Sequence, residues 1–437
     1  MENTVYIGMS ADLIHPGHLN VINEGRKLGR VIIGLLTDRA IASYKRVPYL
    51  NFDQRKSVIE NIVGISEVIA QGELDYTANL VKIKPRYVVH GDDWQTGVQQ
   101  LTRQKVINTL KEWGGELIEV KYTEGISSTL IQNSLRQIGV TPQNRLLRLQ
   151  RILEAKSCMT LMEAHDGLSG LIVENTFYKD DAGKKNEFDA IWVSRKTDTL
   201  AKGKSQAEEV DFTSSLQTLN EILEVTTKPV IFDGGTGGKA EHMAYTIRSL
   251  ERLGVSAIVI KEEMIATTDE SAAEQSLHRQ ESVSLFCAKI TAARKASITG
   301  HFMIMVNMPV ALSVTGPENA VDLAKIYIEA GADGIMIDGA AADANEVFAF
   351  CSQYGRLNNK VPLLAGIQPG VVATVSELQQ AGINMAIYTS HLLCSAFPAM
   401  NRTALSVLQY GGGRETENGL IAIEKLEQFT RQHNSET

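Results

Sequence analysis

The feature that most constrains the fold is a regular alternation of short apolar segments with longer amphipathic segments along the whole chain. The short segments have the length and residue types of strands, and the longer ones have helical spacing. This pattern predicts an α/β protein with parallel strands. In the first 120 residues the expected strands are 4–9, 31–37, 67–70, 87–90 and 116–120, with helices such as 18–27 and 53–61 between them. Five strands of this kind favour a small doubly wound, Rossmann-like sheet.

A second alternation occupies the rest of the chain. Its eight expected strands are 169–174, 190–194, 229–233, 257–261, 303–307, 334–338, 362–365 and 385–388. Eight strands separated by helices are what a closed (β/α)8 barrel requires, and an open sheet is the alternative. A polar segment rich in arginine separates the two patterns. Because 437 residues exceed one compact core, we expect a domain at 1–135, a linker at 136–150 and a second domain at 151–437.

Composition excludes several classes of function. The net charge of −8 argues against a general affinity for nucleic acids, which select basic surfaces. The four cysteines lie far apart without a CxxC pair, so the sequence predicts neither a zinc site nor a disulfide framework. We find no signal peptide and no apolar run of the ~18 residues that a membrane helix needs. We therefore expect a cytoplasmic protein without a membrane partner.

The first motif with chemical meaning follows the first expected strand and contains Asp12, His15, Gly17 and His18. Its two imidazoles are three residues apart at the expected start of a helix, where free N–H groups and the helix dipole favour a phosphate. Gly17 would let the backbone approach that phosphate closely. Histidines placed there could stabilise the charge that grows as pyrophosphate leaves. The alternative is a helix start whose histidines are incidental.

Two further features follow in order along the chain. Arg55 lies in a basic helix start, shortly after Lys45 and Arg46. The tract from Glu124 to Thr129 offers backbone and hydroxyl donors that suit the β- and γ-phosphates of a triphosphate, although its serines could equally be ordinary helix caps.

These motifs carry a resemblance. Residues 1–135 resemble the HxGH cytidylyltransferase family, especially the members that act on glycerol phosphate. The family's motifs correspond here to MSADLIHPGH, GDDW at 91–94, YTEGISST at 122–129 and QRKSVIE at 54–60. Met9, Ala11 and Tyr122 depart from the family's pattern. The resemblance implies catalytic roles for His15, His18 and Arg55. It implies nucleotide binding by Met9, Ser10, Asp12, Gly17, Arg46, Asp93, Trp94, Gly125, Ile126, Ser127, Ser128 and Thr129.

The resemblance also implies a reaction. CTP would bind with Mg²⁺, an acceptor oxygen would attack the α-phosphorus in line, and pyrophosphate would leave. Related HxGH enzymes use ATP, but the EGISST and GDDW tracts favour CTP. A small phosphonate or a phosphorylated alcohol is the expected acceptor.

The second domain resembles the phosphoenolpyruvate mutase and isocitrate lyase superfamily, most clearly over residues 202–242. A barrel of this kind joined to an HxGH cytidylyltransferase recurs in phosphonate biosynthesis. There the barrel converts phosphoenolpyruvate to phosphonopyruvate, and the N-terminal domain can place CMP on a downstream phosphonate. The superfamily commonly forms tetramers, which implies a homo-oligomer assembled through the barrel.

The residues expected at the barrel site depart from that superfamily. Relative to the mutases, Gly235 lacks a metal-binding carboxylate, Lys261 replaces a Glu, Asn307 replaces the Arg that holds the substrate carboxylate, and Asp338 replaces a His. Mg²⁺ needs several oxygen ligands, and a lysine beside its site would repel it. The expected altered site comprises Trp192, Asp233, Gly235, Lys261, Glu262, Glu263, Asn307 and Asp338.

Three interpretations of the barrel stay open at this stage. It is a non-catalytic scaffold for the transferase, it binds or transforms another ligand through rebuilt acidic residues, or it keeps the mutase reaction through replacements that the sequence does not reveal. In the last case the chain would be a bifunctional mutase and cytidylyltransferase. A further alternative is that the whole chain is a non-catalytic ligand-binding or assembly protein.

Overall fold

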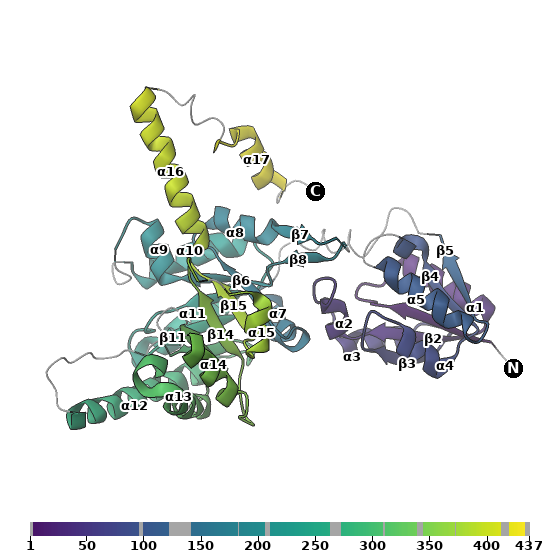
Figure 1. The fold of residues 1–437 in the computed structure, drawn as a ribbon, viewed down its shortest axis with the longest axis horizontal. Coiled ribbons are helices and arrows are strands. Elements are labelled where there is room, and N and C mark those ends of the chain that lie inside the picture. Colours follow the sequence, from purple (N-terminus) through teal and green to yellow (C-terminus); the bar gives the residue numbers. More distant parts are fainter. Residues whose placement is uncertain are drawn as a thin grey trace. The chain divides into compact units, whose positions relative to one another are not determined.

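The computed structural model describes residues 3–95, 99–121, 141–181, 183–205, 210–262, 272–308, 311–338, 344–371, 373–411 and 419–432 (Figure 1). The chain divides into two compact units. The first comprises Met1–Ile138 with two short segments, Glu154–Lys156 and Phe177–Glu187, and the second comprises the remaining residues. Within the described ranges, no helix is long and apolar enough to cross a membrane.

The N-terminal unit is a parallel sheet with helices on both faces. Its strands are β1 (Thr4–Met9), β2 (Arg30–Leu36), β3 (Ile65–Gln71), β4 (Tyr87–Gly91) and β5 (Glu116–Val120), in the spatial order β3-β2-β1-β4-β5. Its helices are α1 (Pro16–Leu28), α2 (Asp38–Ala42), α3 (Phe52–Glu60), α4 (Thr77–Ile83), the 3-10 turn η1 (Asp92–Gln95) and α5 (Gln100–Lys111). All five strands predicted for this domain are confirmed.

The two faces of this sheet are buried by different helices. Ile22 of α1 and Ile59 of α3 pack with Val5 and Ile7 on one face. Leu80 of α4 and Leu110 of α5 belong to the cluster on the other face. Strand order reverses between β1 and β4, and in such sheets a ligand binds at the carboxyl ends of the strands beside this reversal.

The second unit is a closed barrel of eight parallel strands, as predicted. The strands are β6 (Met159–Glu163), β9 (Ala190–Ser194), β10 (Val230–Asp233), β11 (Ala257–Lys261), β12 (Met303–Asn307), β13 (Gly334–Asp338), β14 (Leu363–Ile367) and β15 (Met385–Tyr388). The helices are α7 (Pro142–Ala155), α8 (Gly167–Asn175), α9 (Arg195–Ala201), α10 (Phe212–Glu224), η4 (Ala240–His242), α11 (Met243–Leu253), α12 (Ala272–Ala296), α13 (Ala311–Glu329), α14 (Ala344–Tyr354), α15 (Val375–Gln380), α16 (His391–Tyr410) and α17 (Ile423–Gln432). A separate hairpin pairs β7 (Phe177–Lys179) with β8 (Lys185–Glu187).

The first predicted barrel strand, 169–174, is wrong. These residues lie in α8, and the strand is β6, which ends before the helix begins. Asp166 caps α8: its carboxylate accepts a hydrogen bond from the backbone of Ser169 at 2.7 Å, and Ser169 bonds back to the Asp166 backbone. This reciprocal cap makes Asp166 the N-cap, three residues before the segment 169–174 that was predicted as a strand. Helix α7 begins at Pro142, so it includes part of the segment that the sequence analysis assigned to the linker.

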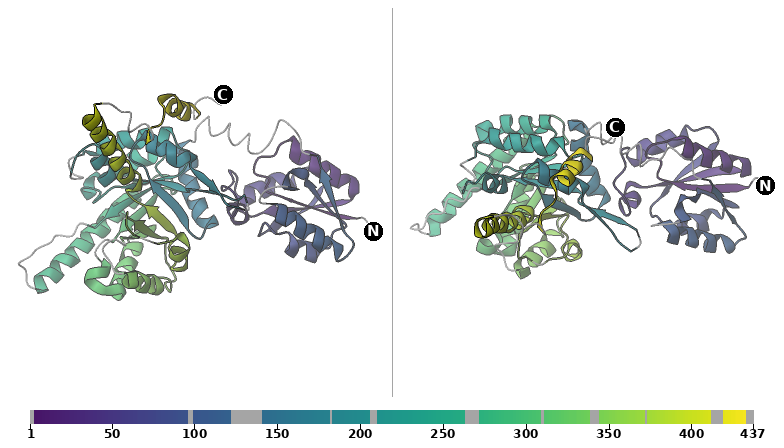
Figure 2. Two further views of the ribbon diagram at one scale, coloured as in Figure 1. Left: turned by 45° about the horizontal axis from the view of Figure 1, so that its top comes forward. Right: turned by 90° about the horizontal axis from the view of Figure 1, so that it is seen from above.

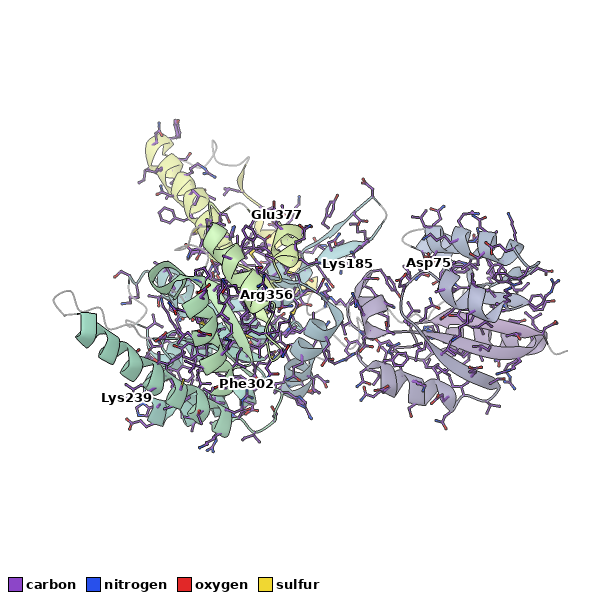
Figure 3. The ribbon with its side chains drawn as sticks, turned by 60° about the horizontal axis from the view of Figure 1, so that its bottom comes forward. Asp75, Lys185, Lys239, Phe302, Arg356 and Glu377 are labelled. Atoms are coloured by element: carbon purple, nitrogen blue, oxygen red, sulfur yellow. The ribbon has the colours of Figure 1, made fainter. Side chains whose placement is uncertain are left out.

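Alternation along the barrel strands decides which side chains face its interior. Ile191 and Val193 of β9 pack with helix residues such as Leu219, so Trp192 and Ser194 point to the opposite side, into the barrel. The same argument turns Asp233, Lys261 and Asn307 inward at the carboxyl ends of their strands. Phe302, fully buried just before β12 at the opposite end of the barrel, is labelled in Figure 3.

Helix α16 extends away from the barrel in Figure 1, and Figure 2 shows the same ribbon from two other directions. None of its 20 residues is buried. Most of its large apolar side chains are exposed, including Phe397 at 66%, Met400 at 60% and Leu408 at 84%, whereas Leu392 packs against the barrel core. A helix with this much exposed apolar surface is typical of a protein interface.

Candidate functional site

A cavity of about 480 Å³ opens at the carboxyl ends of β1, β4 and β5, where the sheet order reverses. This volume is within the range of about 300–1,000 Å³ that is usual for small-molecule sites. Its described lining residues are Ile7, Gly8, Met9, Ser10, His15, Gly17, His18, Val21, Leu36, Tyr44, Lys45, Leu74, Tyr76, His90, Gly91, Asp93, Gln99, Val120 and Lys121.

The turn from β1 into α1 shapes one wall of this cavity. Ala11 has a φ of 51°, a left-handed conformation that a non-glycine residue adopts at a cost. Asp12 is buried, and its carboxylate accepts a hydrogen bond from the backbone N–H of Leu50 at 3.1 Å. Asp12 therefore links this turn to the loop that contains Leu50, just before α3, and is not among the residues that line the cavity.

His15 is the N-cap of α1, and Pro16 begins the helix. The Nδ1 atom of His15 accepts a hydrogen bond from Gly17 N at 3.1 Å, and that of His18 accepts one from His15 N at 3.4 Å. The ring centroids are 4.0 Å apart. Since both Nδ1 atoms act as acceptors, a neutral ring carries its proton on Nε2. The two rings therefore present N–H donors at a helix N-terminus.

Burial keeps both imidazoles neutral. It lowers the pKa of His18 to about 4, with further lowering by the charges of His15 and Lys45. Burial also lowers the pKa of His15. Two neutral donors side by side avoid repulsion when the site is empty, and a bound polyphosphate would favour their protonation.

Lys45 is a cavity residue that the sequence analysis did not assign to the site. Its ammonium donates to Ser10 Oγ at 3.2 Å. Burial lowers its pKa, and the negative charge of Asp12 acts in the opposite direction. The sequence signal was its position just before Arg46, but nothing in the pattern showed which of the two cations faces the β1 turn.

Arg55 lies outside the cavity, although the resemblance assigns it a catalytic role. It is fully buried and donates to the backbone oxygens of Leu50 and Ser10 and to Asp38 Oδ1, the last at 2.6 Å. These bonds join the turn after β1, the loop before α3 and the start of α2 behind the cavity wall.

The GDDW segment forms the opposite wall. His90 stacks on Trp94, with centroids 3.8 Å apart and planes 9° from parallel. Trp94 is buried, and its indole N–H donates to Glu119 at 2.8 Å. Hydrogen bonds from Arg103 are the largest cause that lowers the pKa of Glu119 to about 2. Trp94 thus supports His90, which faces the cavity, and Asp93 lines the cavity directly.

The other nucleotide-binding candidates have varied positions. Met9, Ser10 and Gly17 line the cavity beside the imidazoles. Arg46 forms an ion pair with Glu187 of β8, which groups with the N-terminal unit. Gly125, Ile126, Ser127, Ser128 and Thr129 lie outside the described residues.

The carboxyl ends of the barrel strands bring several of the altered residues together. Asp233 Oδ1 accepts from Gly235 N at 3.0 Å, and Gly235 has a φ of 59°. The backbone of Lys261, at the end of β11, donates to Gly235 O at 2.7 Å, and its side chain is exposed. Asn307 follows in register beside Lys261.

The remaining barrel candidates do not all share this position. Trp192 is buried in β9, and Glu262 is buried where it accepts from Ser282 Oγ at 3.4 Å. Glu263 and the side chain of Asp338 lie outside the described part of the structure. Lys239, shortly after the Gly235 turn, has its Nζ 3.9 Å from a carboxylate oxygen of Glu241, and both side chains are exposed.

Sequence reasoning missed Glu163, because it assigned the first barrel strand to the wrong segment. Glu163 is the last residue of β6, is 1% exposed, and accepts hydrogen bonds from Ser194 Oγ and Ser390 N. Burial raises its pKa, and the charge of Asp233 contributes. Among the described residues, no group of three or more Asp, Glu, His or Cys could hold a metal ion.

Comparisons with known proteins separate the chain into the same two parts. A family model described as cytidylyltransferase-like matches residues 6–134, and one described as phosphoenolpyruvate phosphomutase matches residues 149–408. The N-terminal part is 28% identical over 141 residues to the bifunctional protein HldE of Pseudomonas aeruginosa, which covers 32% of this chain and 29% of HldE.

The barrel resembles characterised relatives over almost their full length. A phosphoenolpyruvate phosphomutase of Tetrahymena pyriformis is 25% identical over 283 residues, covering 64% of this chain and 89% of that protein. The crystal structure of a phosphonopyruvate hydrolase in complex with oxalate and Mg²⁺ shares the barrel fold with a TM-score of 0.56 at 24% identity. It covers 67% of this chain and 96% of that one.

Proposed function

The chain belongs to the phosphoenolpyruvate phosphomutase family through its barrel. On that premise we propose that its enzymatic activity is a nucleotidyl transfer, performed by the cytidylyltransferase-like domain joined to the barrel. In this proposal it transfers CMP from CTP to a small phosphonate and releases pyrophosphate. The names of two relatives of the barrel, a phosphoenolpyruvate phosphomutase and a phosphonopyruvate hydrolase, support a phosphonate as the acceptor. A phosphorylated alcohol is the competing acceptor.

One observation carries the proposal. His15 and His18 present two Nε2–H donors at the start of α1, in a cavity at the reversal of the sheet order. Hydrogen-bond donors held rigidly at such a point stabilise charge that develops on phosphate oxygens. Because backbone N–H groups occupy both Nδ1 atoms, the rings need no reorientation when that charge appears.

The reaction balances without a covalent enzyme intermediate. An oxygen of the acceptor phosphonate attacks the α-phosphorus of CTP, and the bond from that phosphorus to the bridging oxygen breaks in line. The electron pair leaves with pyrophosphate, where His15, His18 and Lys45 neutralise it. Arg55 contributes by holding the Ser10 turn that carries this wall.

Mg²⁺ would accompany CTP in this site and supply charge neutralisation on its phosphates. Asp93 is the carboxylate that lines the cavity within the described residues. One carboxylate together with substrate phosphates suits Mg²⁺, which keeps several of its waters. His90 and Trp94 form the wall that would contact the base or the acceptor.

We propose that the barrel no longer catalyses the mutase reaction and serves as a scaffold or an altered ligand site. Gly235, Lys261 and Asn307 stand where mutase chemistry would need a carboxylate, a second carboxylate and an arginine. We further propose that the barrel assembles the chain into a homo-oligomer, in which the exposed apolar face of α16 is covered by a second copy.

The test is pyrophosphate release from CTP with a panel of acceptors that includes 2-hydroxyethylphosphonate, 2-aminoethylphosphonate and glycerol phosphate. We expect release with at least one phosphonate and not with ATP in place of CTP. The His18→Ala variant is the control for the site. Equal release by wild type and variant, or none with any acceptor or nucleotide, would instead support a binding or assembly protein.

A second assay addresses the barrel. Phosphonopyruvate is supplied with Mg²⁺, and phosphoenolpyruvate is followed by phosphorus NMR. We expect no conversion, and Mg²⁺-dependent turnover would show that the barrel is still a mutase.

A further inference from the structure

A short hairpin supplies a carboxylate to the N-terminal unit. The hairpin pairs β7 with β8 and lies in sequence between α8 and β9, yet its residues belong to the N-terminal compact unit. Glu187, the last residue of β8, forms two hydrogen bonds with Arg46. Arg46 Nε donates to one carboxylate oxygen, and Nη2 donates to the other at 2.8 Å. This bidentate geometry fixes the orientation of both groups.

The carboxylate of Glu187 is shielded and is held by its own hairpin. The Arg46 side chain is 16% exposed, and that of Glu187 is 10% exposed. Lys185, labelled in Figure 3, has its Nζ 3.1 Å from Glu187 Oε2 and 4.6 Å from the ring centroid of Phe177. An ion pair with so little exposure is screened by water less than an ordinary surface pair. Glu187 is therefore a fixed anchor for the guanidinium.

Arg46 belongs to the loop 43–51, which joins α2 to α3 and contributes to the wall of the nucleotide cavity. Near the start of the loop, Lys45 N donates to a backbone oxygen of α2 at 3.0 Å. Near its end, Leu50 N donates to Asp12 at 3.1 Å. Between these two attachments, the ion pair of Arg46 joins the loop to the hairpin.

The position of the Lys45 ammonium depends on the path of this loop. Lys45 Nζ donates to Ser10 Oγ at 3.2 Å, in the turn that leads from β1 to the imidazoles of His15 and His18. Because Arg46 is the next residue in the chain, a shift of the loop at Arg46 also shifts Lys45. The attraction between an ammonium and a phosphate in a partly desolvated cavity changes steeply with their separation.

We infer that Glu187 is a positioning residue of the nucleotide site: it holds Arg46 and thereby keeps Lys45 at the Ser10 turn. The inference rests on the proposed function, since it takes CTP as the ligand of this cavity. It gives Arg46 a role other than the direct nucleotide binding that the family resemblance implies. The part of the sequence that forms the barrel thus also supplies a component of the transferase, whether or not the barrel catalyses a reaction.

The experiment is calorimetric titration of the full chain with CTP and Mg²⁺. Glu187→Gln keeps the shape of the side chain and removes its charge, and we expect it to weaken CTP binding by about tenfold. In a Lys45→Met background the same change should have less than about a twofold effect, because the group that Glu187 positions is then absent. A general disturbance of the fold would act equally in both backgrounds.

Glu67→Gln is the matched control. Its carboxylate pairs with Arg30 at 2.9 Å within the same unit, and both side chains are exposed. Because neither residue is among the lining residues of the cavity, this variant should bind CTP as the wild type does.

A charge exchange separates positioning from direct contact with the nucleotide. Arg46→Glu and Glu187→Arg should each weaken CTP binding. The double variant should return to within about threefold of the wild-type affinity, since the ion pair forms again with its ends exchanged. If Arg46 itself binds the nucleotide, the double variant stays as weak as Arg46→Glu.

The outcomes distinguish this inference from the proposed function. Wild-type affinity in Glu187→Gln, an equal loss in the Lys45→Met background, or a double variant that is not restored would each overturn the inference alone. A wild type that binds CTP but releases no pyrophosphate with any acceptor would overturn only the proposed reaction. A wild type that does not bind CTP would overturn both.

Discussion

Replacing Arg55 tests whether its guanidinium is catalytic or structural, because its sequence context suggests catalysis and its position in the structure indicates a structural role. We consider Arg55→Met, which keeps the apolar length of the side chain and removes its charge and donors. The change leaves Asp38 and the backbone oxygens of Ser10 and Leu50 without this donor. Removing one member of a buried ion pair costs about 3–5 kcal/mol. The Asp38 side chain is 22% exposed, so water recovers part of this loss and about 3 kcal/mol is a reasonable expectation.

The assay is thermal unfolding of the full chain, in which the transition of the N-terminal domain should move down by roughly 10 °C. Arg39→Met, on the exposed surface of α2 next to Asp38, is the matched control and should change little. The reasoning is refuted if Arg55→Met leaves this transition in place and yet abolishes pyrophosphate release. That result would mean that the guanidinium reaches the nucleotide, as the family resemblance implies.

Three further predictions concern other parts of the molecule. The pKa of His18 in the folded protein, about 4, lies below its ordinary value of 6.5. The free energy of unfolding of the N-terminal domain should therefore fall by up to about 3 kcal/mol as the pH falls from 6.5 to 4. His18→Ala should flatten this part of the plot of unfolding free energy against pH, and an unchanged slope would contradict the assignment. Gly8→Ala would place a methyl group against the buried ring of Tyr76, whose hydroxyl donates to Gly8 O at 3.2 Å. We expect a loss of about 2–3 kcal/mol in denaturant unfolding, and an unperturbed variant would show that the ring can move freely. Leu408→Glu in α16 should lower the oligomeric state measured by analytical ultracentrifugation, because a charge would enter the proposed interface; a wild-type monomer would contradict that interface.

Most strands could be predicted from the sequence, because parallel strands buried on both faces are short apolar runs with clear breaks between them. Five of the barrel strands, β9, β11, β12, β13 and β15, have the predicted bounds. The failure at 169–174 has a physical cause. An apolar run of that length suits a buried helix as well as a strand, and the pattern alone does not distinguish them. The cap formed by Asp166 and Ser169 was the signal that could have done so.

The nucleotide site was predictable only where local sequence determines the geometry. His15 and His18 are close in sequence, so the start of α1 alone determines the position of one ring relative to the other. Arg55 and Lys45 differ, since which cation faces the cavity depends on contacts with the Ser10 turn, which is more than 30 residues away in sequence. Likewise, Arg195 directly follows β9 and Gly235 follows β10, so their proximity depends on how these two strands pair and could not be inferred from the sequence around either residue.

The central claim is that the imidazoles of His15 and His18 stabilise the negative charge that develops on the phosphate oxygens of CTP as pyrophosphate leaves. The most direct measurement is kcat/KM for pyrophosphate release from CTP with the best phosphonate acceptor, in wild type and in His18→Ala, with unfolding transitions recorded for both proteins. Loss of one fixed donor in such a site should lower the rate by about 10²–10³-fold, while the fold stays intact at neutral pH. A His18→Ala enzyme as fast as the wild type would contradict the account.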